Sequence, residues 1–253
     1  MGLIKNRSEI ELMRESCSIV AQVLKHITGF IEPGVTTEKL DKVIEDFIIS
    51  KGGIPAFKGY GGSRKVKPYP ASACISVNEE VVHGIPGEKV LNEGDIVSVD
   101  VGVKKNGYFG DSAKTYKVGK VSQKKETLMK VTEESLFLGI GQAGDGNELN
   151  DIASAIQSHC EGHGFGVVRA LVGHGIGKNL HEEPAVPNYF VPNNRFRLRQ
   201  GMVIAIEPMI NYGTYEVKTL RDGWTIVTAD GEPSAHFEHT ILITDTKPEI
   251  LTL

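Results

Sequence analysis

Two aspartates, Asp100 and Asp111, stand in the segment VSVDVGVKKNGYFGD, which spans residues 97–111. Alternating valines predict a β-strand, and Asn106-Gly107 is typical of the type I′ turn of a hairpin. In that register Gly102 faces Asp111, so the carboxylates share one face, with Cβ atoms roughly 7 Å apart and no side chain between them. Two bare charges at that distance repel by about 2 kcal/mol at an effective dielectric of about 20. A divalent cation between them would offset this repulsion, whereas a solvated hairpin face would need no explanation.

Three further side chains of metal-binding type lie on predicted sheet segments of the second half. His174 sits between glycines in VGHGIG, and Glu207 ends a predicted strand just before a proline. Glu238 lies in AHFEHT, where strand alternation puts it on the face opposite Phe237 and His239. Taken singly, these are a core histidine, a strand end and an exposed acid. Taken with the two aspartates, they form a set of four carboxylates and one imidazole.

This set predicts a centre with two divalent metal ions, because two such ions balance four negative charges. Oxygen-rich ligands without thiolate suit Mn²⁺, Fe²⁺ or Co²⁺, with Zn²⁺ less distinctive. Two metals about 3.5–4 Å apart can share a bridging water and deliver it as hydroxide near neutral pH. The chemistry that this set favours is therefore metal-assisted hydrolysis.

The elements that must position these residues follow from periodicity and capping signals. A capping box at residues 8–11 predicts the start of an amphipathic helix, and Thr36 or Thr37 caps a second helix that Gly52-Gly53 closes. Two more helices are expected near residues 123–140 and 149–160. Strands are expected near residues 73–77, 202–207, 215–217, 224–228 and 236–243.

The order of these elements repeats along the chain. Leu91-x-x-Gly94-x-Ile96-Val97-x-Val99-Asp100 recurs 107 residues later as Leu198-x-x-Gly201-x-Val203-Ile204-x-Ile206-Glu207. Coincidence is the alternative, since each match alone is weak. The repeat predicts two similar halves, roughly 1–120 and 121–253, within a single catalytic domain, 1–253. A pseudo-twofold arrangement of the halves would bring the two terminal carboxylates of the repeat to one central site.

Composition narrows the class of protein. The 253 residues are 40% hydrophobic and 24% charged, with a net charge of −4, which is typical of a globular chain and gives no footprint for nucleic acid. The basic cluster of Arg64, Lys65 and Lys67 is too small to change that. Three scattered cysteines predict neither a disulfide framework nor a thiolate zinc site. No apolar run is long enough for a membrane span, and the N-terminus does not resemble a signal peptide, so a cytoplasmic enzyme or binding protein is expected.

Five segments make the prediction specific, and the likeness covers essentially the whole chain. They are CISVNEEVVHGIP, SVDVGVKKNGYFGDSAKT, VGHGIGKNLHEEP, AIEPM and FEHTILIT, and they resemble type I methionine aminopeptidases of the compact bacterial form. The resemblance implies the α/β (α+β) pita-bread fold, two pseudo-symmetric halves around a central dinuclear metal site. It also implies removal of the initiator methionine from nascent polypeptides whose second residue is small.

The same resemblance implies roles for individual residues. Asp111 and Glu238 would bridge both metals, Asp100 would complete one, and His174 and Glu207 would complete the other. Glu207 would also act as the general base.

Further roles carry over to residues outside the ligand set. His181 would stabilise the oxyanion and His83 would contact the scissile amide; without the resemblance both are ordinary loop histidines. The methionine pocket would be formed by Tyr60, Tyr69, Cys74 and Trp224, which otherwise are plain core packing. Asn78 and Ser234 match positions that some members of the family use for a monovalent cation.

Two departures from the family pattern concern substrate fit. Leu180 stands where many bacterial relatives have an aromatic residue, and Gly61–Pro68 is an insertion between the two pocket tyrosines. The rival functions are prolidase or aminopeptidase P, which usually carry a separate N-terminal domain, and a non-catalytic binding protein, which typically has lost ligands. The expected partner is the N-terminal methionine of a nascent chain near the ribosome, with no specific nucleic acid, no membrane and a monomeric state.

Overall fold

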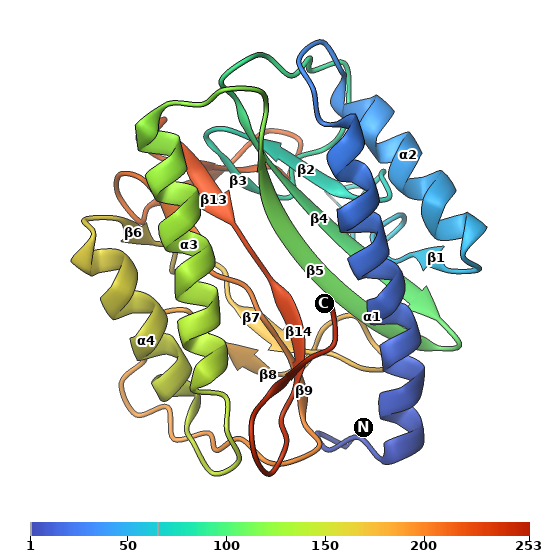
Figure 1. Cartoon of the computed structure of the whole chain (residues 1–253), viewed down its shortest axis with the longest axis vertical. Coiled ribbons are helices and arrows are strands. Elements are labelled where there is room, and N and C mark those ends of the chain that lie inside the picture. Colours follow the sequence, from blue (N-terminus) through green and yellow to red (C-terminus); the bar gives the residue numbers. More distant parts are fainter. Residues whose placement is uncertain (1, 65) are drawn as a thin grey trace.

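Figure 1 shows the computed structural model, which describes residues 2–64 and 66–253; Lys65, part of the basic cluster and of the insertion, lies outside the described residues. The helices are α1 (Arg7–Ile27), η1 (Thr28–Phe30), α2 (Thr37–Ser50), α3 (Gln123–Gly141) and α4 (Leu149–Gly162). The strands are β1 (Ile54–Pro55), β2 (Cys74–Val77), β3 (Glu80–Val82), β4 (Ile96–Lys105), β5 (Tyr108–Lys117), β6 (Gly166–Val167), β7 (Gly173–Gly175), β8 (Glu182–Val186), β9 (Val203–Ile206), β10 (Met209–Asn211), β11 (Val217–Thr219), β12 (Ile226–Thr228), β13 (Ser234–His236), β14 (His239–Leu242) and β15 (Glu249–Ile250).

The helix ends agree with the sequence signals except at the start of α1. Its N-cap is Asn6, whose Oδ1 accepts hydrogen bonds from the Glu9 N–H and from Ser8 Oγ, while the Glu9 carboxylate accepts from the Asn6 N–H. The predicted capping box at Ser8 was therefore wrong by two residues. The prediction for α2 is confirmed, because Thr36 caps it and Gly52 adopts a positive φ of 70° just after its end.

Two antiparallel sheets carry the predicted site segments. In one sheet β4 pairs with β1, β2 and β5, and in the other β14, β9, β7 and β8 are neighbours in that order, with β15 beside β14. Figure 1 shows α1 and α2 on one side of the long β4–β5 hairpin and α3 and α4 on the other. Each helix pair packs on its own apolar cluster, with α1 and α2 against the valines of β4, and α3 and α4 against β9 and β14.

One pair of backbone hydrogen bonds occurs twice, at the starts of α2 and α4. Leu91 exchanges two bonds of 2.8 Å with the segment Gly34–Val35, just before α2. Leu198 exchanges bonds of 3.0 and 2.8 Å with the segment Gly146–Asn147, just before α4. Leu91 and Leu198 are equivalent residues of the sequence repeat, so equivalent residues make equivalent contacts in the two halves.

The strand expected over residues 236–243 is interrupted. It forms β13 and β14, with Phe237 and Glu238 between them. The Glu238 N–H bonds to the carbonyl of Ala113 on β5 at 2.9 Å, away from the ladder of its own sheet. This interruption lets the Glu238 side chain reach across toward the β4–β5 hairpin.

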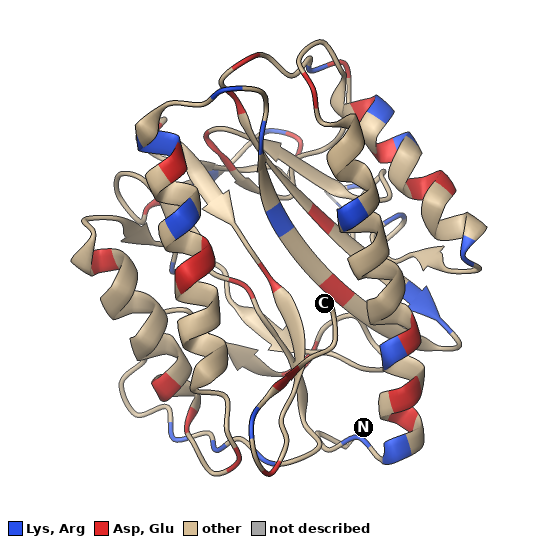
Figure 2. Ribbon diagram, in the orientation of Figure 1, with Lys and Arg blue, Asp and Glu red and all other residues tan. Residues whose placement is uncertain are grey.

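Charged residues of both signs alternate along the outer helices, as Figure 2 shows. The short ion pairs on α2 illustrate this pattern: Lys42 lies 2.7 Å from Asp46 one turn later. None of the helices in the described residues is long and apolar enough to cross a membrane.

Candidate metal centre

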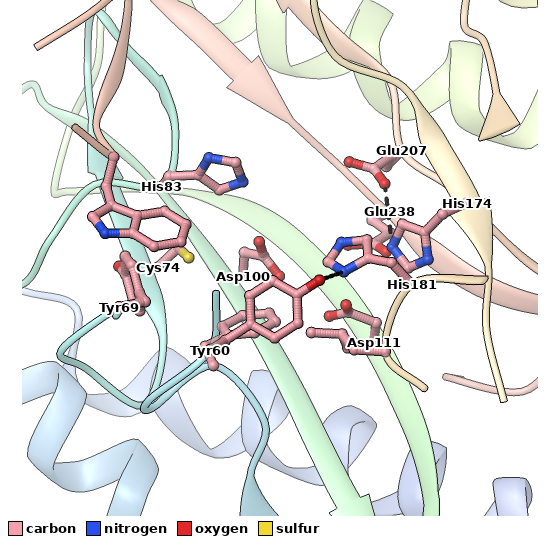
Figure 3. A pocket seen from close by; sticks show the side chains of 13 residues that line it. Tyr60, Tyr69, Cys74, His83, Asp100, Asp111, His174, His181, Glu207 and Glu238 are labelled. Carbon is pink, nitrogen blue, oxygen red and sulfur yellow. Dashed lines mark hydrogen bonds and ion pairs between the residues drawn. The ribbon is translucent and has the colours of Figure 1, made fainter. Parts of the chain in front are cut away.

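A cavity of about 120 Å³ collects the side chains that the sequence singled out (Figure 3). Both halves of the chain contribute to its wall. The lining residues are Phe57, Tyr60, Tyr69, Cys74, His83, Asp100, Asp111, His174, Leu180, His181, Glu207, Trp224 and Glu238. The structure therefore brings all five metal-ligand candidates, both histidines and all four pocket candidates to one place.

The β4–β5 hairpin carries Asp100 and Asp111 in the predicted register. Gly102 is paired with Asp111, and the turn residues Asn106 and Gly107 have positive φ angles of 51° and 85°, as a type I′ turn requires. The face that bears the two carboxylates is not solvated, since Asp111 is only 3% exposed. The interpretation of these residues as surface acids was therefore wrong.

Gly102 has a neighbour other than the cation expected between the two aspartates. A Cβ added at this residue would lie 2.6 Å from the ring of Phe57 and 3.0 Å from the Cβ of Ala56. Glycine is required here because a neighbouring aromatic ring packs against the strand, and not because a metal occupies the space beside it. Phe57 in turn forms part of the cavity wall.

His174 lies on β7 between Gly173 and Gly175, and neither glycine leaves room for a side chain. A Cβ at Gly173 would collide with the carbonyl oxygen of Ala205, and a Cβ at Gly175 with the carbonyl oxygen of Glu183. The ring is held by its Nδ1–H, which donates to the Gly175 carbonyl at 2.9 Å. That bond leaves the Nε2 lone pair directed at the cavity, as a metal ligand requires.

The ligand atoms of Asp111, His174 and Glu238 all lie within 4.8 Å of one another, which is close enough for one ion. Asp100 and Glu207 line the same cavity beside this trio (Figure 3). Asp100 Oδ1, Asp111 Oδ1 and Glu238 Oε1 are buried without a hydrogen-bond partner. Since buried carboxylate oxygens normally have donors, these three atoms fit divalent cations as their missing partners.

The electrostatics of the cavity agree with this fit. Burial raises the pKa of Asp111 to about 7. Burial and then the charge of Asp111 raise the pKa of Asp100, Glu207 and Glu238 well above their ordinary values. Burial and then His181 lower the pKa of His174 to about 3, so its ring is neutral and free to coordinate. Without cations, the carboxylates would have to hold protons in order to coexist.

His83 and His181 lie on opposite parts of the cavity wall. The backbone of His83 has a φ of 59°, in the left-handed region that residues other than glycine seldom adopt, and its ring is 6.3 Å from that of Trp224. Burial and then His181 lower the pKa of His83 to about 4. The His181 ring lies 4.2 Å from the His174 ring at an interplanar angle of 54°, and its Nδ1 is 2.6 Å from Tyr60 Oη.

The rest of the cavity wall consists of aromatic rings and a cysteine thiol. Tyr69 and Trp224 meet edge to face at 5.3 Å, and Tyr69 Oη donates to the Gly84 carbonyl at 2.8 Å. Cys74 is buried beside them, and burial followed by the charge of Asp100 raises its thiol pKa well above the ordinary value. This arrangement keeps the thiol protonated, so that it contributes packing and not charge.

The segment expected to be an insertion, Gly61–Pro68, lies in the loop between Tyr60 and Tyr69. The Tyr69 N–H bonds to the Tyr60 carbonyl at 2.9 Å, and Trp224 Nε1–H donates to the Lys67 carbonyl at 2.8 Å. Both tyrosines therefore line the cavity, and the Lys67 carbonyl holds the indole N–H of Trp224.

Asn78 and Ser234, the residues expected near a monovalent cation, lie together, and Lys125 reaches the first of them. Asn78 Oδ1 accepts from the Lys125 ammonium at 2.7 Å, and the same ammonium bonds to the Gly94 carbonyl at 2.7 Å. The Asn78 carbonyl accepts from the Ser234 N–H at 2.9 Å, and Ser234 Oγ donates to the Ile210 carbonyl at 3.1 Å. The Lys125 ammonium therefore contacts the side-chain oxygen of Asn78, and a monovalent cation held by Asn78 and Ser234 stays a prediction.

Sequence reasoning missed two residues near the site, Phe57 and His236. His236 is 1% exposed, its Nε2 is 3.9 Å from Glu207 Oε2, and burial and then His83 lower its pKa to about 3. Strand alternation could have found it, because His236 stands two residues before Glu238. Phe57 has no comparable signal, since its position depends on the packing around Gly102.

Comparison with known proteins agrees with the metal-binding character of the cavity. The model of metallopeptidase family M24 matches residues 11–245. Methionine aminopeptidase of Clostridium acetobutylicum is 52% identical over all of this chain and 99% of its own length. Methionine aminopeptidase of Escherichia coli is 44% identical over 99% of this chain and 93% of its own length.

Solved structures confirm the fold. The crystal structure of methionine aminopeptidase from Thermotoga maritima has a TM-score of 0.94 and 46% identity, and the match covers 98% of each chain. Prolidase from Pyrococcus furiosus, at 23% identity and a TM-score of 0.78, shares the fold over 99% of this chain and 65% of its own. The expected α/β pita-bread fold is confirmed by these neighbours. The chain therefore belongs to metallopeptidase family M24 and, within it, to the type I methionine aminopeptidases.

Proposed function

We propose that this chain removes the initiator methionine from polypeptides whose second residue is small, with two divalent metal ions in the cavity. The observation that carries the proposal is the convergence of three donorless carboxylate oxygens with His174 Nε2 beside an aromatic, thiol-containing wall. Methionine aminopeptidases that are 50–52% identical over the whole chain support the choice of substrate.

The metal assignment follows the resemblance to the family. Asp111 and Glu238 would hold both ions, Asp100 would hold one of them, and His174 and Glu207 would hold the other. The donorless oxygens of Asp100, Asp111 and Glu238 support metal binding by these three residues. The oxygen-rich set without thiolate favours Mn²⁺, Fe²⁺ or Co²⁺ over Zn²⁺. Bound ions of this kind supply Lewis-acid polarisation of a carbonyl and a lowered pKa for a water.

Three side chains of the protein move or hold protons in this proposal. Glu207 accepts a proton from the attacking water and passes it to the leaving amine, and its raised pKa suits this exchange at neutral pH. With Tyr60 Oη–H as the donor to Nδ1, a neutral His181 keeps its proton on Nε2 and directs it at the developing oxyanion. His83, on the opposite wall, contacts the scissile amide.

The methionine side chain is proposed to bind against Tyr60, Tyr69, Cys74 and Trp224. What supports this is the edge-to-face pair of Tyr69 and Trp224 beside the buried Cys74, because a thioether packs favourably on aromatic rings. The free α-amine of the substrate would lie near Asp100, on the same side of the cavity.

We also infer that residues 1–253 act as one catalytic domain of two halves, roughly 1–120 and 121–253. The matched hydrogen bonds before α2 and α4 support the division into two similar halves. Both halves contribute residues to one cavity, which supports a single catalytic domain. A monomer that acts in the cytoplasm on nascent chains near the ribosome remains our prediction for the setting, based on the substrate alone.

The test is methionine release by the metal-reconstituted protein from Met-Gly-X peptides, where X is any third residue. We expect release with Mn²⁺, Fe²⁺ or Co²⁺, and we expect Asp111→Ala to reduce it below detection because a bridging ligand is lost. Asp46→Ala, which removes an exposed carboxylate paired with Lys42, is the matched control and should retain full activity.

Two other outcomes would overturn the proposal. Release of X from X-Pro peptides without release from Met-Gly-X would assign the chain to the prolidase branch. No hydrolysis with any of the three metals would assign it to the binding proteins of the same fold.

A further inference from the structure

His236 is a buried imidazole to which the proposed reaction assigns no role. It is the last residue of β13, it is 1% exposed, and its Nε2 has no hydrogen-bond partner. An unpaired buried nitrogen is uncommon and normally has a specific cause. The nearest charged group recorded for this nitrogen is Glu207 Oε2, at 3.9 Å.

The Glu207 carboxylate lies between two imidazoles from different strands. Its Oε1 is 3.6 Å from His174 Nε2 on β7, and its Oε2 is 3.9 Å from His236 Nε2 on β13 (Figure 3 shows the first contact). Each oxygen of the carboxylate therefore has its own histidine.

The two contacts differ in where the proton can be. The His174 Nδ1–H donates to the Gly175 carbonyl, so its Nε2 presents a lone pair to Glu207 Oε1. Two lone pairs facing each other are favourable only when a cation lies between them, which fits a shared metal. At Oε2 there is no such constraint, and a neutral His236 ring can present Nε2–H to an ionised carboxylate.

We propose that His236 is a positioning residue whose Nε2–H donates to Oε2 of Glu207 and thereby leaves Oε1 for the metal shared with His174. This inference rests on the proposed function, because it assigns a partner to the general base of that reaction. The distance of 3.9 Å is longer than a hydrogen bond, and such contacts commonly tighten when an active site is filled.

The test compares His236→Gln with His236→Met. The two replacements have nearly the same length and volume, but only glutamine offers an N–H donor. We expect His236→Met to weaken Mn²⁺ binding, measured by calorimetry without substrate, by about 10–100-fold, as is typical when the outer partner of a metal ligand is lost. The kcat for Met-Gly-X should fall by a similar factor with KM unchanged, and His236→Gln should stay within a few-fold of the unsubstituted protein.

The matched control is His239→Met, which removes a half-buried imidazole three residues along. Its Nδ1 bonds to Thr252 Oγ1 at 2.8 Å, outside the cavity, so Mn²⁺ binding and turnover should not change. Equal losses in His236→Gln and His236→Met, or normal Mn²⁺ binding by His236→Met, would overturn the proposal. So would unfolding of His236→Met alone in EDTA, because the role would then be structural.

Calorimetry keeps this test separate from that of the proposed function. If the unsubstituted protein binds Mn²⁺ but does not release methionine, the function fails while the difference between the glutamine and methionine variants still decides the role of His236.

Discussion

At the scale of single residues, the cavity concentrates negative charge where water cannot solvate it. Asp111 is 3% exposed and Glu238 is 2% exposed, and one oxygen of each has no donor. Four carboxylates in such surroundings are compatible only if they hold protons or bind cations. The metal-free protein is therefore expected to lose stability as pH rises, at the same groups that give the loaded protein its chemistry.

The substitution Asp111→Asn should reveal this loss of stability in the metal-free protein, that is, in EDTA. Burial raises the pKa of Asp111 to about 7 in the folded protein, whereas the unfolded chain has the ordinary value of about 3.9. Between these values the folded state binds more protons, so the free energy of unfolding falls as pH rises from about 4 to 7. Asparagine has no proton to lose, so the variant should be more stable than the unsubstituted protein at pH 8.

Urea unfolding in EDTA at pH 4 and pH 8 measures this difference. The gain should disappear at pH 4, where the carboxyl of Asp111 is protonated in the folded protein. Equal stability of the two proteins at pH 8 would contradict the argument.

Residue types and spacing predicted much of the site, because ligand chemistry leaves a signature in sequence. Asp100 and Asp111 could be placed on one face from the turn alone, and the cavity holds them with the other candidates. The reason for Gly102 and the presence of Phe57 could not be predicted, since both depend on contacts between segments far apart in the chain. His236 was within reach of the alternation argument, but its contact with Glu207 comes from another strand.

At the scale of elements, Lys125 connects α3 to the first half of the chain through hydrogen bonds. Its ammonium bonds to Asn78 Oδ1 and the Gly94 carbonyl, both at 2.7 Å, on the segments that precede β3 and β4. A contact between distant turns of this kind has no signature in local sequence. The sequence predicted the helix and the turns correctly but gave no means of pairing them.

Lys125→Met should reduce the free energy of unfolding by about 1.5–3 kcal/mol, the usual worth of hydrogen bonds to a charged group. Lys130→Met, on the same helix and exposed, loses only a long ion pair of 3.8 Å and should change stability little. Urea unfolding measures both variants. The same measurement in NaCl and in KCl tests the predicted monovalent cation: a different midpoint in the two salts would show specific binding, and equal midpoints would count against it.

Element boundaries were predicted best where one residue decides them. Thr36 and Gly52 frame α2 as expected. At α1 two polar residues competed, and Asn6 prevailed because its side chain reaches both Ser8 and the backbone of Glu9. The break between β13 and β14 escaped prediction, because it arises from a bond between Glu238 and Ala113 on another sheet.

At the scale of the whole molecule, the cavity lies where the two halves meet. The first half contributes Asp100 and Asp111, and the second contributes His174, Glu207 and Glu238. The repeat in the sequence indicated such a meeting, since it ends in Asp100 in one half and Glu207 in the other. The volume of the cavity had no equivalent signal, because it results from packing over the entire chain.

Metal binding should stabilise the whole chain and not only the site, because the ligands join both halves. At 100 times the dissociation constant a ligand adds about 2.7 kcal/mol. For a chain of this length that corresponds to a rise in Tm of about 5–11 °C, at roughly 2–4 °C per kcal/mol. Calorimetric scans with and without Mn²⁺ measure the rise. Asp111→Asn should show little or none of it, and an equal rise in that variant would place the stabilising ions elsewhere.

The ring of Phe57 over Gly102 has a consequence for drug resistance. The ring fills the space that any side chain at residue 102 would need, and it also forms part of the cavity wall. A larger residue at position 102 would push the ring and so reshape a cavity that residue 102 does not itself line. An inhibitor that fills this cavity would then lose its fit through a substitution at a residue it never touches. Surveillance limited to drug-contacting residues would overlook such a mutation.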